Sequence, residues 1–211
     1  MSTLKKLQLE TLVLGMASTN CYLAKNRETG AMLIIDPAED ADRIARKIAG
    51  MAGTPEAILL THGHFDHIGA ASALGTKYQI PVCALGQERE ILEDPVKNLT
   101  FWTGKGYSLR ADRYFSDQEE FCAAGFSVRV LHTPGHTVGS TCYYLPEEGV
   151  LFSGDTLFRC SAGRTDFPTG SMSDIHHSIH EKLFVLPEET EVFPGHEAAT
   201  TIGYEKRYNP Y

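Results

Sequence analysis

The sequence predicts an α/β fold in which two mixed β-sheets face each other and helices cover their outer faces. Three observations indicate it: short apolar runs typical of buried strands, hairpin turns between some of these runs, and amphipathic helical stretches that connect others. The pattern of runs occurs twice along the chain, which favours one α/β sandwich built from two related halves. A chain of 211 residues has the length of one domain, and we assign residues 1–211 to a single domain.

The first half is expected to contain four strands and two helices. Alternating leucines, a hairpin turn at residues 26–30 and a continuous apolar run indicate the strands. They are residues 7–14, Cys21–Ala24, Ala31–Ile35 and Ala57–Thr61. Ile44 and Ile48, four positions apart after an acidic start, predict a helix that ends near Gly50, and Ile68–Tyr78 is the second expected helix.

The second half repeats this order. Its expected strands are Phe126–Leu131, Thr141–Leu145, Val150–Ser153 and a final short strand, Glu191–Phe193. A turn at residues 146–149 predicts that the middle two form a hairpin. A helix with a serine cap and with Ile175, Ile179 and Leu183 on its buried side is expected before the last strand. Asp94–Tyr107, between the halves, has no clear period and is expected to be a long loop.

The composition disfavours several kinds of partner. Lys and Arg number 19 against 27 Asp and Glu, and the formal charge of −8 opposes binding to nucleic acids and anionic membranes. The five cysteines form no CxxC pair and have no regular spacing, as in proteins that keep reduced thiols in the cytoplasm. Residues 1–20 alternate charged and apolar side chains, unlike a signal peptide, and no run approaches the ~20 apolar residues of a membrane span. We therefore expect a cytoplasmic protein.

Histidine and aspartate side chains gather directly after four of the expected strands. The motif HGHFDH follows Ala57–Thr61, and the motifs PGH, SGD and PGH follow three later strands. The candidate ligands in these motifs are His62, His64, Asp66, His67, His136, Asp155 and His196. Because sites in sheet-based folds assemble at the carboxyl ends of strands, we expect these side chains to lie together. Glycines beside most of them permit the tight, positive-φ turns that aim a side chain across such an edge.

Five imidazoles and two carboxylates suit zinc, manganese or iron as divalent cations. Seven ligands exceed what one tetrahedral ion needs, so we expect two metal ions, with zinc as the first choice. The expected assignment is one ion on His62, His64 and His136, a second on Asp66, His67 and His196, and Asp155 as the bridge. Metal binding lowers the pKa of water from ~15.7 to about 7, so the pair can hold a bridging hydroxide as nucleophile. Asp66 can also orient this hydroxide, which makes Asp66 and Asp155 the expected catalytic carboxylates.

Structural explanations for this cluster are less favoured. A lone histidine usually has no function beyond its place on the surface or in the core. That explanation does not account for a dense cluster of histidines with matching glycine turns. A closed structural metal site generally uses four ligands rich in cysteine, and none of the five cysteines lies in these motifs. By contrast, His176, His177 and His180 fall on the exposed side of an expected helix. Cys160 is expected to be a small buried side chain, and its alternative is to line the site, since it comes five residues after Asp155.

The motifs resemble those of the metallo-β-lactamase-fold hydrolases, and among them glyoxalase II, or hydroxyacylglutathione hydrolase. The resemblance extends from about residue 20 to the C-terminus. Its markers are Thr61–His67, Pro134–Thr137, Gly154–Phe158, Gly163–Phe167 and Pro194–His196. The closing Gly203–Pro210 is similar to the end of the short, single-domain bacterial type. The resemblance implies a four-layer αββα sandwich and the two-metal assignment given above, position by position.

The resemblance also implies hydrolysis of a thioester of a small thiol such as glutathione. A thiolate whose conjugate acid has a pKa near 8.5 leaves without a strong general acid, which suits a site built of metal ligands. Arg164 could bind a substrate carboxylate, and its alternative is to pair with Asp166 and shape its own loop. The chain differs from glyoxalase II in two respects: it ends before the helical domain that helps hold glutathione, and Ala198 stands where the family has a tyrosine.

Other activities stay open at this point. A mononuclear iron persulfide dioxygenase on the same fold would need only His62, His136 and Asp155, which leaves four ligands without a task. The β-lactamases share the HxHxD core but lack a carboxylate in the position of Asp155. A metal-storing module would have a filled coordination shell and no turnover. In the central loop, Phe101, Trp102 and Tyr107 are expected to pack over an exposed sheet edge, with an apolar lid over the site as the alternative.

Overall fold

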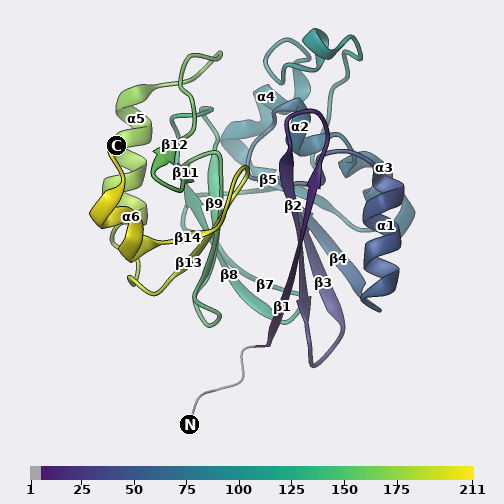
Figure 1. Cartoon of the computed structure of the whole chain (residues 1–211). Coiled ribbons are helices and arrows are strands. Elements are labelled where there is room, and N and C mark those ends of the chain that lie inside the picture. The colour runs from purple at the N-terminus through teal and green to yellow at the C-terminus, as the bar shows by residue number, and fades with distance from the viewer. Residues whose placement is uncertain (1–5) are drawn as a thin grey trace.

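The computed structural model describes residues 6–211, and its two six-stranded mixed sheets face each other across a common core (Figure 1). In spatial order, the first sheet contains β1 (Leu7–Leu14), β2 (Thr19–Asn26), β3 (Ala31–Ile35), β4 (Thr54–Leu59), β5 (Val82–Leu85) and β6 (Arg113–Phe115). The second contains β14 (Thr200–Thr201), β13 (Glu191–Pro194), β10 (Val150–Gly154), β9 (Thr141–Leu145), β8 (Phe126–His132) and β7 (Glu120–Ala123). A third, two-stranded sheet consists of β11 (Leu157–Phe158) and β12 (Ser161–Ala162).

Helices cover the outer face of each sheet, so the expected four-layer α/β sandwich is confirmed (Figure 1). On the first sheet lie α1 (Ala41–Gly50) and α3 (Ala71–Tyr78). On the second lie α5 (Met172–His177), the π-helical turn Ser178–Leu183 and α6 (Ile202–Tyr208). The short helices α2 (Phe65–Ile68) and α4 (Arg89–Glu93), with the 3-10 turns Gly86–Glu88 and Thr100–Thr103, belong to loops at the upper edge of the sandwich.

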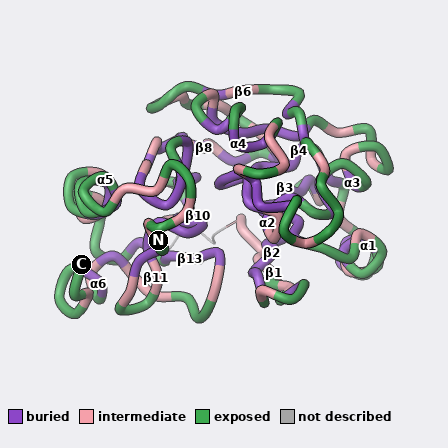
Figure 2. The backbone as a smooth tube through the Cα atoms, turned by 90° about the horizontal axis from the view of Figure 1, so that it is seen from above, coloured by how far each residue is buried: buried purple, intermediate pink, exposed green. Residues whose placement is uncertain are grey.

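Apolar side chains form a core between the sheets and one further layer under the helices of each sheet. Leu33, Tyr143 and Phe152 pack in the central layer. Ile44 of α1 packs against the outer face of the first sheet, and Ile179 of the π-helical turn packs against that of the second. The buried colour therefore follows the strands in Figure 2. Strands covered on both faces have continuous apolar sequences, which is why β3 and β10 could be predicted as short apolar runs.

Two elements of the first half differ from the expectation. The strand expected over Ala57–Thr61 is β4, which both begins and ends earlier. The helix expected over Ile68–Tyr78 is divided into α2 and α3. At the division, the amide of Ala70 donates a hydrogen bond to the carbonyl of Pro37 (2.8 Å), so the chain is held against the loop after β3 instead of continuing α2.

Other elements were not predicted at all. Strands β5, β6, β7 and β14 and helices α4 and α6 have no counterpart in the sequence-based expectation. Glu191–Phe193 belongs to β13 and is not the final strand, because β14 follows and pairs with it. Asp94–Tyr107, expected to be a loop, contains a 3-10 turn. These elements have two to seven residues, too few to show a reliable period in the sequence.

No helix among residues 6–211 is long and apolar enough to cross a membrane. All five cysteines are free thiols, and Cys122 and Cys160 are exposed. The expectation of a buried Cys160 was wrong, because this residue lies in the turn between β11 and β12.

Candidate metal centre

The seven candidate ligands converge at one edge of the sandwich, where loops from both sheets meet. The ligands of the HGHFDH motif follow β4 of the first sheet, and the other three follow β8, β10 and β13 of the second. Asp66 and His196 are half-buried, and the other five are buried. Three overlapping sets of their nitrogen and oxygen atoms have the proximity that one metal ion requires. Their roles as ligands stay predictions.

The first group contains His62, His64 and His136. Nδ1 of His64 lies 2.9 Å from Nε2 of His136, so two imidazole nitrogens from opposite sheets point at one another. Nδ1 of His136 donates to the carbonyl of Arg164 (2.7 Å), and Nδ1 of His62 lies 3.2 Å from Oγ1 of Thr61. Because these partners occupy Nδ1, they leave Nε2 of His62 and His136 available to a cation.

The second group contains Asp66, His67 and His196. Oδ2 of Asp66 lies 3.4 Å from Nε2 of His196 and 3.6 Å from Nε2 of His67. Oγ1 of Thr19, at the start of β2, donates to the same carboxylate oxygen (2.8 Å) and fixes its direction. A cation between these three side chains would have one oxygen and two nitrogen donors, a set that zinc, iron and manganese accept.

Asp155 stands between the two groups. Its Oδ1 lies 3.4 Å from Nε2 of His67, in the second group. Its Oδ2 lies 3.5 Å from Nε2 of His136, in the first group, and 3.5 Å from Nε2 of His196. A carboxylate that faces both groups has the position required of a bridging ligand.

Four buried polar atoms of the described chain show whether these residues fit a metal pair. Nε2 of His62, His64 and His67 and Oδ1 of Asp155 have no hydrogen-bond partner. Leaving a buried polar atom unpaired costs about 1–3 kcal/mol, so four of them in one place would be expensive without a ligand. Imidazole nitrogens and carboxylate oxygens are the donors that divalent transition metals prefer. The donor set therefore fits two divalent cations.

In the absence of metal, the pKa values of the histidines differ between the two groups. Burial and the neighbouring imidazoles lower the pKa of His62 well below its ordinary value and that of His64 to about 3, so both rings are neutral, the form that metal binding requires. Burial also opposes the charged form of His67 and His196. The ionised Asp66 and Asp155 outweigh it, so the pKa of His67 rises to about 9 and that of His196 to about 10. A cation in the second group would take the place of these protons.

Asp36, directly after β3, supports the site and was missed in the sequence. It is 1% exposed, and its Oδ2 accepts hydrogen bonds from Nδ1 of His67 (2.9 Å) and Oγ1 of Thr61 (2.6 Å). Its Oδ1 accepts from the amide of Thr61 (2.8 Å). This carboxylate fixes the tautomer of His67, with the proton on Nδ1 and the lone pair on Nε2. The signal in the sequence was an aspartate ending the apolar run Ala31–Ile35, as Asp155 ends a similar run.

The glycines next to the ligands act in two different ways. Gly135 and Gly154 have φ values of +138° and +50°, the positive values expected of a tight turn. Gly195, before His196, is needed for space instead: a Cβ there would lie 2.2 Å from Oδ1 of Asp155 and 2.7 Å from Cε1 of His67. Backbone and ligands therefore approach one another as closely as a glycine allows.

Replacing Gly195 by alanine is expected to abolish tight binding of two metal ions, because its methyl group would displace ligands from both groups. Titration of the metal-free protein with zinc or cobalt, followed by metal analysis after gel filtration, measures the stoichiometry. Gly50→Ala is the matched control, since a Cβ there has no neighbour within 4 Å. Two tightly bound ions in Gly195→Ala would contradict this arrangement of ligands.

The backbone carbonyl of Arg164 holds His136, but the side chain of Arg164 is directed toward its own loop. Its guanidinium forms two hydrogen bonds to Asp166 (2.6 and 2.7 Å) and lies 4.0 Å from the ring centre of Phe167. The ring of Phe167 in turn lies 5.6 Å from that of His64, so this loop borders the first group. The pair of Arg164 with Asp166, one of the two alternatives expected for this arginine, is therefore present, and both charged side chains are largely exposed.

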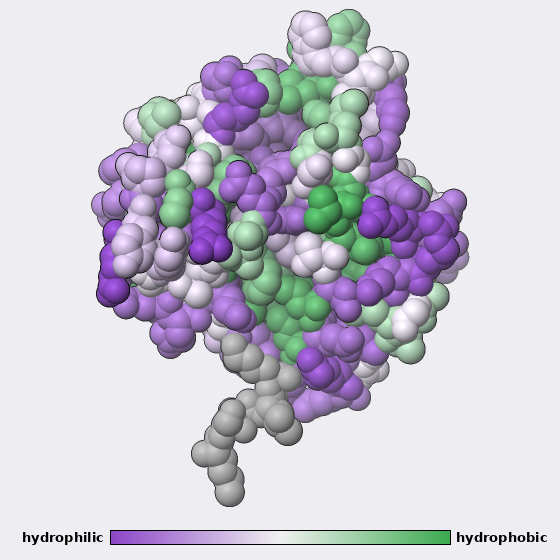
Figure 3. Space-filling view, in the orientation of Figure 1, coloured by the Kyte–Doolittle hydropathy of each residue, from purple (hydrophilic) through white to green (hydrophobic). Residues whose placement is uncertain are grey.

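Other residues considered in the sequence lie away from the ligands. His176, His177 and His180 are exposed, as expected. Phe101 and Trp102 are 59% and 74% exposed, so the expectation that they pack over a sheet edge was wrong for these two. They lie on the 3-10 turn Thr100–Thr103, which protrudes at the top of the molecule and contributes to its apolar surface there (Figure 3). Tyr107 is half-buried and packs against the apolar cluster that contains Ile44.

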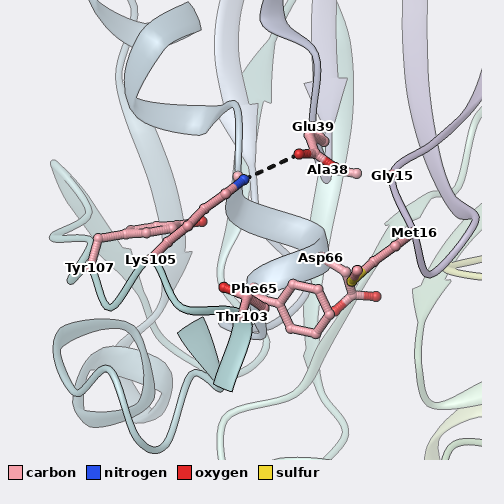
Figure 4. Close-up of a pocket in the computed structure, with 10 residues that line it drawn as sticks. Gly15, Met16, Ala38, Glu39, Phe65, Asp66, Thr103, Lys105 and Tyr107 are labelled. Carbon is pink, nitrogen blue, oxygen red and sulfur yellow. Dashed lines mark hydrogen bonds and ion pairs between the residues drawn. The ribbon is translucent and has the colours of Figure 1, made fainter. Parts of the chain in front are cut away.

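A pocket of about 190 Å³ opens beside Asp66, on the side of the second group (Figure 4). Its apolar lining includes Met16 in the turn between β1 and β2, Phe65 of α2 and Tyr107. Lys105 and Glu39 form an ion pair at its rim (3.2 Å). The pocket gives the metal centre a predominantly apolar neighbour.

Comparison with known proteins agrees with the observed fold. A model of the metallo-beta-lactamase superfamily matches residues 14–196. The chain is 34% identical over 208 residues to hydroxyacylglutathione hydrolase GloC of Haemophilus influenzae, covering 97% of this chain and 98% of the relative. These matches include all the motifs that supply the seven candidate ligands.

Solved structures give the same result. The BLEG-1 B3 metallo-beta-lactamase has a TM-score of 0.91 and 41% identity, covering 96% of this chain and 98% of that one. TTHA1623 in a di-iron-bound form has a TM-score of 0.84 and 33% identity, covering 95% of this chain and 98% of that one. ETHE1 from Myxococcus xanthus has a TM-score of 0.78 and 32% identity, covering 96% of this chain and 83% of that one. By its fold, its motifs and these matches, the chain belongs to the metallo-beta-lactamase superfamily.

Proposed function

We propose that this protein is a binuclear metal-dependent hydrolase that cleaves thioesters of a small thiol, with zinc as the metal and iron or manganese as substitutes. The observation that carries the proposal is the pair of ligand groups joined by Asp155, because a single-metal enzyme has no use for the second group. The similarity to hydroxyacylglutathione hydrolase GloC supports the thioester as the substrate class. The similarity to a di-iron-bound structure supports occupation by two metals.

Each group of the chain has a defined task in this reaction. Two divalent cations, when bound, supply a hydroxide nucleophile at neutral pH and stabilise the negative charge on the carbonyl oxygen. Asp155 and Asp66 are the catalytic carboxylates: Asp155 holds the two ligand groups at a fixed separation, and Asp66 orients the nucleophile. The thiolate leaves without a general acid, since its conjugate acid has a pKa near 8.5.

Arg164 is the substrate-binding residue in this proposal. Its ion pair with Asp166 is exposed, and exposed pairs contribute only about 0–1 kcal/mol. The guanidinium can therefore exchange Asp166 for a carboxylate on the thiol portion of the substrate. Arg164 belongs to the loop that borders the first group, whereas the apolar pocket lies beside Asp66 of the second group. This pocket suits the acyl portion of the thioester.

Met16→Ala is expected to lower kcat/KM about fivefold for thioesters with a six-carbon acyl group and to leave acetyl thioesters nearly unchanged. Met16 is 82% exposed, so its removal does not disturb the fold, while packing of a long acyl group against its side chain stabilises the bound substrate by on the order of 1 kcal/mol. Steady-state kinetics on a series with one thiol and varied acyl groups measures this. Val185→Ala, also exposed but away from the pocket, should show no dependence on acyl length. A uniform effect on all members of the series would exclude the pocket as the acyl site.

The activity itself is tested by metal analysis combined with a rate assay on S-lactoylglutathione. Two metals per chain with release of free thiol would support the proposal. Two metals per chain without thioester cleavage would refute the proposed substrate class, while the proposed metal centre would stand. Nitrocefin, a chromogenic β-lactam, belongs in the same assay because of the similarity to the BLEG-1 B3 metallo-beta-lactamase. If the enzyme cleaved nitrocefin faster than any thioester, β-lactams would replace thioesters as the proposed substrate class.

Oxidation of a persulfide by a mononuclear iron site is the second candidate, and the similarity to ETHE1 favours it. Such a site would use His62, His136 and Asp155, and Nε2 of His136 lies 3.5 Å from Oδ2 of Asp155. Oxygen uptake with glutathione persulfide distinguishes the two activities. One iron per chain together with oxygen consumption would overturn the hydrolase proposal.

A further inference from the structure

Glu88 is a buried carboxylate outside the group of candidate ligands. It ends the 3-10 turn after β5 and is 1% exposed. Its Oε1 accepts a hydrogen bond from the amide of Gly63 (2.7 Å). Its Oε2 accepts from the amide of Gly139 (2.9 Å) and from Oγ1 of Thr137 (2.9 Å). All three donors are uncharged, so this carboxylate is held by hydrogen bonds alone.

These donors belong to the two loops that carry the first group of ligands. Gly63 lies between His62 and His64, in the loop after β4 of the first sheet. Thr137 and Gly139 follow His136 directly, in the loop between β8 and β9 of the second sheet. One carboxylate therefore connects the two halves of the first group across the gap between the sheets.

The contact between Glu88 and these loops is as close as the backbone permits. A Cβ on Gly139 would lie 2.2 Å from the amide nitrogen of Glu88 and 2.5 Å from its Oε2. A Cβ on Gly63 would lie 3.1 Å from side-chain atoms of Ile91 and Leu92 in α4, which follows Glu88. The loop after β8 can reach the carboxylate only because Gly139 stands at the point of contact, and Gly63 leaves little room for a larger residue in the other loop.

Burial makes this arrangement costly. It raises the pKa of Glu88 to about 7, although the hydrogen bonds from Gly63, Thr137 and Gly139 act in the opposite direction. An apolar side chain would fill the same space without this cost, but it could not accept hydrogen bonds from both loops. Costly polar groups that local structure does not require are typical of functional sites.

We propose that Glu88 is a positioning residue for the first metal, which fixes the loop with His62 and His64 against the loop with His136. The second group has a separate support, since His67 is held by Asp36 and Asp66 by Thr19. Loss of Glu88 therefore weakens the first metal site more than the second. The inference concerns ligand placement and holds whichever substrate the enzyme cleaves.

Glu88→Gln tests this with a side chain of the same size. A carboxamide has one acceptor oxygen, so its NH₂ group must face the amide of either Gly63 or Gly139, and two donors then oppose each other. Titration with cobalt, read by its absorption spectrum and by competition with a chelator, is expected to show 10- to 100-fold weaker binding of one ion and little change in the other. His196→Ala, which lacks a ligand of the second group, isolates the first site. Adding Glu88→Gln to it should weaken the one tight site that is left.

Glu205→Gln is the matched control. Glu205 is fully buried and also accepts three hydrogen bonds, from the amide of Cys160, Oγ1 of Thr200 and Nδ2 of Asn209, none of which lies in a loop of the first group. We expect it to lower thermal stability while both ions bind with wild-type affinity. Wild-type binding of both ions in Glu88→Gln, or equal weakening in Glu205→Gln, would overturn the proposal.

A milder variant covers the case in which Glu88→Gln does not fold. Thr137→Val keeps the shape of the side chain and removes only its hydrogen bond to Oε2 of Glu88. It is expected to weaken the first ion severalfold and to leave the second unchanged. Unchanged affinity for both ions in a folded Thr137→Val would count against the proposal.

Discussion

Asp155→Ala is expected to lose nearly all hydrolytic activity, by a factor on the order of 10³ or more. Asp155 is the only one of the seven candidate ligands whose two carboxylate oxygens face different groups, at 3.4 Å from His67 and 3.5 Å from His136. Without it, two bound cations would lose the only carboxylate of the candidate ligands that faces both groups, and this charge offsets part of their mutual repulsion. Loss of several kcal/mol of transition-state stabilisation corresponds to this factor in rate. Metal content and kcat with a thioester substrate measure the two effects together.

His177→Ala is the control for Asp155→Ala. His177 is exposed on α5 and contacts none of the ligands. Its replacement should change metal content and rate by less than a factor of two. Equal losses in the two variants would refute the assignment of Asp155 as the bridge.

The fold class could be predicted because several of its strands are buried on both faces. Every residue of β3 and β10 is buried, β3 is apolar throughout, β10 starts with three apolar residues, and each strand begins after a hairpin turn. β6 and β7 are short strands with exposed residues, and their sequences show no such run. Their position is set by pairing with β5 and β8, a long-range contact that no local pattern records.

The candidate ligands could be predicted because each belongs to a short motif at the end of an apolar strand. Residues that hold these ligands have no comparable motif. Asp36 precedes its partner His67 by 31 positions, and Glu88 is 51 positions before Gly139. Asp36 does end an apolar run, but among 27 Asp and Glu neither it nor Glu88 can be recognised as a support for a ligand until the fold brings it to its partners. The sequence therefore shows which atoms can bind a metal, and the fold shows what aims them.

Asp36→Asn and Asp36→Ala are expected to separate metal binding from stability. In Asp36→Asn the amide oxygen can still accept from the amide of Thr61, while the NH₂ group faces Nδ1 of His67 and donates to it. His67 must then carry its proton on Nε2, the atom that faces Asp66 and Asp155. A protonated Nε2 cannot bind a metal, so affinity for the second ion should fall about 10- to 100-fold at nearly unchanged stability.

In Asp36→Ala the three donors around this buried position lose their acceptor. An unsatisfied buried donor costs about 1–3 kcal/mol, so the free energy of unfolding of the metal-free protein should fall by roughly 3 kcal/mol or more. Urea unfolding of the metal-free forms and zinc titration of the folded forms give the two quantities independently. If Asp36→Asn bound the second ion as tightly as the wild type, the hydrogen bond to Nδ1 would not set the tautomer of His67. If it instead lost as much stability as Asp36→Ala, Asp36 would serve the fold and not the metal.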